Sequence, residues 1–261
     1  MEKINKIVVF TDCYDIAYNE IYVVLSNALK ENGVLDVTLD PPVAIKPFSI
    51  VNASFSIRLL ADHYPCGTLF LVIMNATSKN PARIFGKTKH GITFVGNNSG
   101  YFGWLIEDFG LEFLYENQIC RSKDGRSFGG KYVQVPTAAK LVAGAVPQAL
   151  GLKRESSFLY RYPIAEGTVV HCDNFGLMKI KAPPPKGIKD QQKLKILING
   201  RASVEGLFSK NLKTSADGTW VVFQGSSLGG LPELGKVRSK HSADALGVQE
   251  GDQVTWEEVK G

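Results

Sequence analysis

The first apolar run of the chain ends in a carboxylate. Four apolar residues, Ile7 to Phe10, are followed at once by Thr11 and Asp12. An unbroken run of this kind predicts a strand that is buried on both faces. In an open α/β sheet, small ligands bind beyond the carboxyl ends of such strands. Asp12 is therefore the first candidate for a ligand-binding residue.

The remainder of the N-terminal half alternates between strand-like runs and segments with helical spacing. Asn32-Gly33 and the Asp-Pro-Pro sequence at 40–42 supply stop signals between them. Strands and helices in alternation predict an α/β domain whose sheet is mainly parallel, with right-handed crossovers. The expected strands are 6–11, 34–39, 68–74 and 91–96, and the expected helices are 19–29, 50–63, 101–109 and 136–150.

The pattern changes after Gly151, where short β-type runs are separated by Gly, Asp, Asn and Pro. These runs predict a smaller all-β domain, a barrel or a sandwich. The expected organisation is an N-terminal α/β domain at 1–152, a polar linker at 153–166 and a C-terminal β-barrel-like domain at 167–261. The β-type runs are 167–172, 177–180, 194–198, 220–223 and 253–257.

The composition of the chain argues against a membrane protein and against a nucleic-acid-binding protein. A chain of 261 residues that is 44% hydrophobic can bury two cores. It has no apolar run of about eighteen residues, and Met1-Glu2-Lys3 leads directly into the first strand, so we expect a soluble, cytoplasmic protein with no membrane segment. The net charge of +5 is spread among residues of both signs. We therefore expect no nucleic-acid partner.

Neither the four cysteines nor the four histidines have the spacing of metal ligands, so no metal is expected. Two of these residues keep alternatives open. Cys13, beside Asp12, is either an ordinary reduced thiol or a nucleophile. His171 lies two residues before Asp173, and strand alternation puts both on one face. It is either a structural histidine or a substitute base.

Six short motifs follow one another along nearly the whole chain. Each motif alone is weak, and their order and spacing make the set specific. A phosphate-binding loop and a Gly-x-Gly-x-x-Gly motif after the first strand are both absent from the sequence. The six motifs are 11–12; 65–68 with 75–77; 94–100; 128–131 with 135–139; 173–176; and 225–227 followed by 233–234, 243–247 and 251–252.

In this order the motifs resemble those of the S-adenosylmethionine hydroxide adenosyltransferase family, which includes the fluorinase and the chlorinase. The resemblance implies an N-terminal α/β domain, a C-terminal β-barrel-like domain and a homotrimer. It also implies that S-adenosylmethionine binds between the N-domain of one subunit and the C-domain of the next. In that family, water or a halide displaces L-methionine from the ribose C5′ carbon.

The resemblance assigns substrate-binding roles to matched positions. Asp12 corresponds to the carboxylate that accepts both ribose hydroxyls, a charge-assisted contact. Asp173 and the pair Ser226-Ser227 correspond to the positions that hold the methionine ammonium and carboxylate. Phe48 and Phe175 match aromatic residues that pack on the ligand, where a sulfonium cation is favoured. Each residue alone also has a structural interpretation, as a cap, a turn or a core residue. The presence of all of them, together with the order of the motifs, favours ligand binding.

The positions nearest the reaction depart from the family. Where its hydroxide-transferring members have an aspartate after the central strand, this chain has Asn75, and their histidine is replaced by Gly129. The hydroxide-transferring members also have an arginine a few residues after their aspartate, and Arg83 matches this position. The halogenating members have a tyrosine at the position of Asn75. Without a charged acid/base partner, attack by deprotonated water is not expected.

We place Asn75, Thr77, Ser78 and Gly130 at the reacting centre, where a halide or another nucleophile would need only desolvation and aimed donors. The glycine pair at 129–130 could also admit a larger acceptor than water. The main hypothesis is therefore a transferase-like enzyme that acts on S-adenosylmethionine with a changed nucleophile. A catalytically degenerate binding module and an ordinary hydrolase or halogenase are the alternatives.

Overall fold

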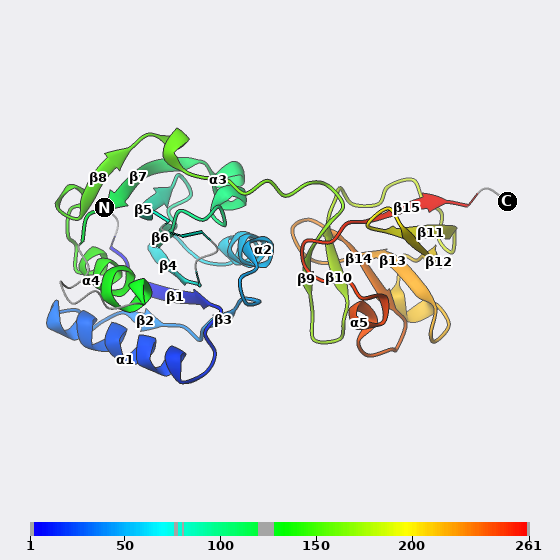
Figure 1. Cartoon of the computed structure of the whole chain (residues 1–261), viewed down its shortest axis with the longest axis horizontal. Helices are drawn as coiled ribbons and strands as arrows, with labels where there is room; N and C mark the ends of the chain where they lie inside the picture. The colour runs from blue at the N-terminus through cyan, green and yellow to red at the C-terminus, as the bar shows by residue number, and fades with distance from the viewer. Residues whose placement is uncertain (1–2, 76–77, 80, 120–127, 260–261) are drawn as a thin grey trace. The chain divides into compact units, whose positions relative to one another are not determined.

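Two sheets, one in each half of the chain, organise the fold (Figure 1). The computed structural model describes residues 3–75, 78–79, 81–119 and 128–259. These residues form two units, Met1–Tyr162 and Pro163–Gly261. The segment expected as a linker, 153–166, contains the end of a strand of the first unit and a helical turn at Ser156–Phe158.

The first sheet is mixed rather than mainly parallel. Its strand order is β2-β1-β4-β6-β5-β7-β8, and β3 also pairs with β1. The pairs of β1 with β2, β3 and β4 and of β4 with β6 are parallel, and the pairs joining β6, β5, β7 and β8 are antiparallel. The strands are β1 Lys6–Thr11, β2 Thr38–Leu39, β3 Val43–Ala44, β4 Thr68–Ile73, β5 Arg83–Thr88, β6 Thr93–Asn97, β7 Leu111–Asn117 and β8 Gly151–Arg154.

Helices cover both faces of this sheet, and β1 divides its side chains between the two layers. Ile7 and Val9 belong to the apolar core that also contains residues of α1 and α4, and Val8 and Phe10 to the core that contains residues of α2 and α3. This alternation explains the unbroken apolar run of β1, since both of its faces are buried. The helices are α1 Ile16–Glu31, α2 Ile50–Ala61, α3 Gly103–Phe109 and α4 Val135–Val142.

Helix α1 begins shortly after β1, and α2 begins shortly after β3, at the end of the sheet where Asp12 lies. The side chain of Asp15 caps α1 by accepting a hydrogen bond from the Ala17 N–H at 2.9 Å. Ser49 caps α2 in the same way, with the Asn52 N–H at 3.2 Å. These caps satisfy backbone donors that have no intrahelical partner. They also fix where the loops after β1 and β3 end.

The sheet of the second unit curls until its two edges meet. Its order is β15-β11-β12-β13-β14-β10-β9, with only the β12–β13 pair parallel. An antiparallel bridge between Thr168 and Gln253 joins the outer strands. The elements are β9 Thr168–Cys172, β10 Met178–Lys181, β11 Lys193–Ile198, β12 Ala202–Phe208, β13 Trp220–Gln224, β14 Pro232–Lys236, α5 Ser242–Leu246 and β15 Val254–Glu258.

Some element bounds differ from the sequence predictions for local reasons. The helix expected at 136–150 ends at Val142, because Gly144 takes the left-handed conformation with φ of 88°. A separate helical turn follows at Pro147–Ala149. The strand expected at 34–39 forms only at Thr38–Leu39. No strand was predicted at the positions of β3, β5, β7, β8, β12 or β14.

Within the described residues, none of the helices is both long and apolar enough to cross a membrane. The same residues contain no group of three or more His, Cys, Asp or Glu side chains placed to hold a metal ion.

Candidate active site

Asp12 lies directly after β1, where its carboxylate accepts hydrogen bonds from two loops. The backbone N–H of Asn75, after β4, is 3.1 and 3.3 Å from the two carboxylate oxygens. The backbone N–H of Phe48 donates to Oδ2 at 3.2 Å, and the Asn75 side-chain amide donates to Oδ1 at 3.3 Å. Because Asp12 is only 9% exposed, these neutral donors compensate for its removal from water.

Asn75 supports Asp12 from the neighbouring strand. Its backbone and its side chain both donate to the same carboxylate. An aspartate at this position would place two like charges side by side, which is unfavourable unless one takes up a proton. Of the other residues predicted near the reacting centre, Ser78 is exposed at a bend, and Thr77 lies outside the described residues.

Phe48 reaches Asp12 through its backbone. Its φ of 59° lies in the left-handed region, which is costly for a residue with a side chain. The hydrogen bond to Asp12 helps to hold this conformation, as does the bond from the Lys46 N–H to the Asn52 side chain at 2.9 Å. The ring is 58% exposed. The structure therefore brings the predicted aromatic residue beside Asp12 and leaves its ring uncovered within this unit.

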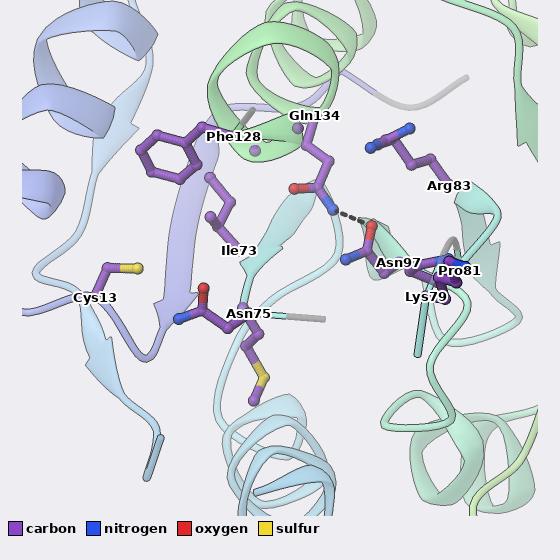
Figure 2. A pocket seen from close by; sticks show the side chains of 12 residues that line it. Cys13, Ile73, Asn75, Lys79, Pro81, Arg83, Asn97, Phe128 and Gln134 are labelled. Atoms are coloured by element: carbon purple, nitrogen blue, oxygen red, sulfur yellow. Dashed lines mark hydrogen bonds between the residues drawn. The ribbon is translucent and has the colours of Figure 1, made fainter. Parts of the chain in front are cut away.

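A cavity of about 410 Å³ opens next to Asn75. Cys13 and Asn75 line it near Asp12, and Arg83, Asn97 and Gln134 line it from β5, β6 and the residue just before α4 (Figure 2). Its volume falls in the range of about 300–1,000 Å³ that is usual for small-molecule sites. A ligand anchored at Asp12 could therefore extend into it.

Two glycines bring the backbone close to this cavity. A Cβ atom on Gly129 would lie 2.5 Å from Arg83 Nη2 and 2.8 Å from Nε, and one on Gly130 would lie 2.5 Å from Ile73 Cγ2. The space that a side chain at position 129 would need is thus occupied by the Arg83 guanidinium. The glycine at position 129, where the family has a histidine, therefore does not leave an empty space. The Arg83 guanidinium occupies that space.

The side-chain amides of Asn97 and Gln134 line the cavity and contact each other. Gln134 Nε2 donates to Asn97 Oδ1 at 3.1 Å, as the dashed line in Figure 2 shows. The Asn97 backbone N–H donates in turn to the hydroxyl of the buried Tyr101 at 2.6 Å. Gln134 is 2% exposed, so its polar end depends on these contacts. The chain of hydrogen bonds fixes Asn97 and Gln134 relative to β6.

Burial raises the pKa of the Cys13 thiol, and the negative charge of Asp12 raises it further, whereas a hydrogen bond involving Thr11 acts in the opposite direction. Cys13 Sγ lies 3.7 Å from Asp12 Oδ1. A thiol with a raised pKa forms little thiolate near neutral pH, so it is a poor nucleophile. The structure favours the interpretation of Cys13 as an ordinary thiol.

In the second unit, Asp173 closes the turn between β9 and β10. Its Oδ1 accepts hydrogen bonds from the backbone N–H groups of Phe175 and Leu177, both at 2.9 Å. The carbonyls of Phe175 and Gly176 accept from residues 241 and 243, at the start of α5. The Phe175 ring is 60% exposed. Asp173 therefore has a clear structural role, and Phe175 presents an uncovered ring.

Ser226 and Ser227 lie at the opposite end of β10 from the Asp173 turn. They belong to the loop between β13 and β14, whose Ser227 carbonyl accepts from the N–H groups of Gly230 and Leu231. Since β10 and β14 are antiparallel, the loop before β14 lies beside the end of β10, and the Asp173 turn lies beside its beginning. The structure does not bring these two predicted methionine anchors together within one unit.

Next to the serine loop, Lys179 forms an ion pair with Glu233 directly across β10 and β14. The two side chains are 15% and 6% exposed. His171 stands opposite Lys179 on the adjacent strand β9. A Cβ atom on Gly225 would collide with the Glu233 carboxylate, so the loop crosses close over the ion pair.

The sequence comparisons agree with this architecture. A family model described as the SAM hydroxide adenosyltransferase N-terminal domain matches residues 7–151. The chain belongs to this family. The match covers the strand that ends at Asp12, both loops that donate to its carboxylate, and the cavity beside them.

Two curated relatives of this family member are named (R)-S-adenosyl-L-methionine hydrolase. The one from Thermus thermophilus is 26% identical over 259 residues, which cover 91% of this chain and 94% of the relative. The one from Methanocaldococcus jannaschii is 22% identical over 153 residues, which cover 59% of this chain and 55% of the relative.

Two solved structures share the fold of this family member. An uncharacterized conserved protein from Thermotoga maritima superposes with a TM-score of 0.79 at 20% identity, covering 96% of this chain and all of that one. A conserved hypothetical protein from Thermus thermophilus gives 0.71 at 21% identity, covering 97% and 100%.

Two polar residues that line the cavity, Lys79 and Gln134, were not predicted from the sequence, and Asn97 was predicted only as a member of the 94–100 motif. One signal was present for Gln134, a polar residue that interrupts the apolar positions Val133 and Val135 at the start of a buried helix. A polar group in such a place needs a partner. No comparable signal marked the contact between Arg83 and Gly129, because β5 itself was not predicted.

Proposed function

We propose that the protein is an enzyme that acts on S-adenosylmethionine by displacing L-methionine from the ribose C5′ carbon with a nucleophile other than base-activated water. The observation that carries this proposal is the bonding of Asn75. Its amide donates to Asp12 at 3.3 Å, and an amide cannot take a proton from water as a carboxylate can.

Asp12 is the proposed ribose anchor. An ionised carboxylate has roughly four acceptor positions, and the backbone N–H groups of Asn75 and Phe48 hold it in place without using all of them. The Asn75 side-chain amide would rotate away to admit the two ribose hydroxyls. The rotated amide would then face the cavity, where Gly130 and Arg83 also lie.

The second unit supplies the proposed contacts to the rest of the ligand. The exposed Phe175 ring is available for packing, and the loop of Ser226 and Ser227 offers hydroxyl and backbone donors for a carboxylate. Because Asp173 and this loop lie at opposite ends of β10 and β14, we propose that they contact different parts of the ligand. The homotrimer implied by the family remains part of the proposal.

Product analysis tests the function. The protein is incubated separately with the R and S sulfonium epimers of S-adenosylmethionine, and the products are resolved by liquid chromatography and mass spectrometry. We expect L-methionine release that depends on an added nucleophile. Nucleophile-independent adenosine formation would instead identify a hydrolase, which the names of the two curated relatives favour.

An Asp12→Asn variant tests whether S-adenosylmethionine binds at Asp12. It removes the charge that holds the ribose, so calorimetric titration should show at least tenfold weaker binding of S-adenosylmethionine. Asp36→Asn, at an exposed position, is the matched control and should bind normally. Equal affinity of the two variants would remove the ribose assignment. Tight binding to the unsubstituted protein with no product from any nucleophile would identify a binding module.

A further inference from the structure

Two cationic side chains line the cavity beside Asn75. Lys79 and Arg83 both line it, and the other polar side chains on its wall, Asn75, Asn97 and Gln134, are amides. Of the lining residues that the structure describes, none is an aspartate, a glutamate or a histidine. Two cationic groups at a partly enclosed site favour an anion over a neutral or cationic ligand.

The backbone also favours an anion. Gly129 and Gly130 line the cavity where a helix begins, and this helix continues through the turn Gly130–Gln134 into α4. The N-terminal end of a helix carries a partial positive charge. At this helix the Lys131 and Tyr132 N–H groups already donate to the Phe128 carbonyl, at 3.1 and 3.3 Å, so the contribution is that of the helix dipole. Because Gly129 has no side chain, the Arg83 guanidinium lies directly against this end.

We propose that this cavity binds a small carboxylate anion of the size of formate or acetate, and that this anion is the nucleophile; the proposal rests on the proposed function. A planar guanidinium can donate two parallel hydrogen bonds to the two oxygens of a carboxylate.

The chemistry balances without a base. A carboxylate oxygen forms a bond to the C5′ carbon while the C5′–S bond breaks, and the sulfur of L-methionine keeps the electron pair. The product is a 5′-O-acyl adenosine, and the positive charge of the sulfonium and the negative charge of the carboxylate are both lost in the reaction. Since a carboxylate carries no proton to be removed, the amide at Asn75 and the glycine at position 129 are no obstacle to this step.

Isotope labelling follows the oxygen. The protein receives S-adenosylmethionine and acetate labelled with oxygen-18, in unlabelled water at constant ionic strength, with chloride as the replacing anion. We expect labelled 5′-O-acetyladenosine. If the ester hydrolyses later at its acyl carbon, the adenosine formed retains one labelled oxygen at O5′. Adenosine whose oxygen comes only from water, or a chlorinated product alone, would overturn the proposal.

Substitutions locate the anion. Arg83→Gln should lower the acetate-dependent rate at least tenfold, with the dissociation constant of S-adenosylmethionine changed less than twofold. Gly129→Ala should act in the same direction, since its Cβ would displace the guanidinium. Lys89→Gln, exposed just beyond the other end of β5, removes the same charge and should retain the full rate. Equal rates for Arg83→Gln and Lys89→Gln would contradict the role of Arg83.

A binding measurement separates this inference from the proposed function. Line broadening of carbon-13-labelled acetate by the protein needs no turnover, and it should be lost in Arg83→Gln and kept in Lys89→Gln. Broadening of this kind with no methionine release would leave the carboxylate site standing while the proposed reaction fails. Methionine release with other nucleophiles, but no Arg83-dependent broadening, would overturn the carboxylate site and leave the proposed reaction intact.

Discussion

Asn75 shows how a single amide changes the chemistry available at the end of β4. Its two N–H donors stabilise the Asp12 carboxylate, whereas an acid at the same place would compete with Asp12 for donors and for charge. The residue that would be expected to orient water therefore holds the carboxylate that we propose as the ribose anchor. Under this proposal, charge at position 75 and ligand binding at Asp12 are coupled.

The first prediction follows from this coupling. Asn75→Asp should lower the free energy of unfolding by about 1–3 kcal/mol at pH 8, because it removes a donor from a buried carboxylate and adds a like charge. The loss should be smaller at pH 5, where one of the two carboxyls can bind a proton in the folded state. Urea denaturation at both pH values measures it.

Asn75→Ala is the control for this comparison, since it removes the amide without adding charge. Its destabilisation should be nearly the same at pH 5 and pH 8. If Asn75→Asp behaved in the same way, like-charge repulsion with Asp12 would not be the cause.

Cys13 reports on the charge of Asp12. Because Asp12 contributes to the raised pKa of this thiol after burial, Asp12→Asn should lower that pKa and increase the thiolate fraction at pH 8. Alkylation of Cys13 by iodoacetamide should therefore become faster, as followed by peptide mass spectrometry. The exposed Cys66 is an internal reference, and Asp36→Asn should leave the Cys13 rate unchanged.

At the residue scale, the sequence predicted the position of Asp12 at the end of a strand but not the residues that surround it. Asp12 could be placed because an apolar strand leads directly to it. The Arg83–Gly129 contact could not, because the two residues lie far apart in sequence and a glycine shows nothing about which group will fill the space beside it. The Phe48 backbone contact depends equally on a loop conformation that no pattern encodes.

At the element scale, the strands buried on both faces were the predictable ones. β1 and β4 are continuous apolar runs, and both form where they were expected. β5 was missed because its sequence, Arg-Ile-Phe-Gly-Lys-Thr, combines charges with a glycine. Its position is decided by pairing with β6 and β7. That antiparallel half is what makes the sheet mixed.

The ion pair between β10 and β14 gives a prediction about these elements. Glu233→Leu should lower the free energy of unfolding by about 3 kcal/mol, since it leaves the largely buried Lys179 ammonium without its counterion. The double variant Lys179→Met with Glu233→Leu should recover most of this loss. Urea denaturation of the two single variants and the double variant forms a thermodynamic cycle. A double variant as unstable as Glu233→Leu would argue against an uncompensated charge as the cause.

At the scale of the whole molecule, the sequence predicted two domains, and the structure forms two units. The change from alternating strands and helices to short β runs was the useful signal. How the predicted anchors Asp173 and Ser226 lie relative to each other could not be predicted, because it depends on the order and direction of strands in the second sheet.

The homotrimer is testable at this scale. Light scattering coupled to size exclusion should give a mass close to three times the 28.5 kDa of one chain. The expectation comes from the family, whose ligand sites lie between subunits. A monomer at micromolar concentration would contradict it and would require all ligand contacts to come from one chain.

The bridge that closes the second sheet also bears on how the protein is made. It joins Thr168, at the start of the second unit, to Gln253, which lies 85 residues further along the chain. Domains generally fold as units during synthesis, from the N-terminal end. The first unit has all of its residues once Tyr162 has emerged from the ribosome, whereas the second cannot close its sheet until Gln253 has emerged. Its unpaired edges are exposed to chaperones and to neighbouring chains while the ribosome synthesises the residues between Thr168 and Gln253.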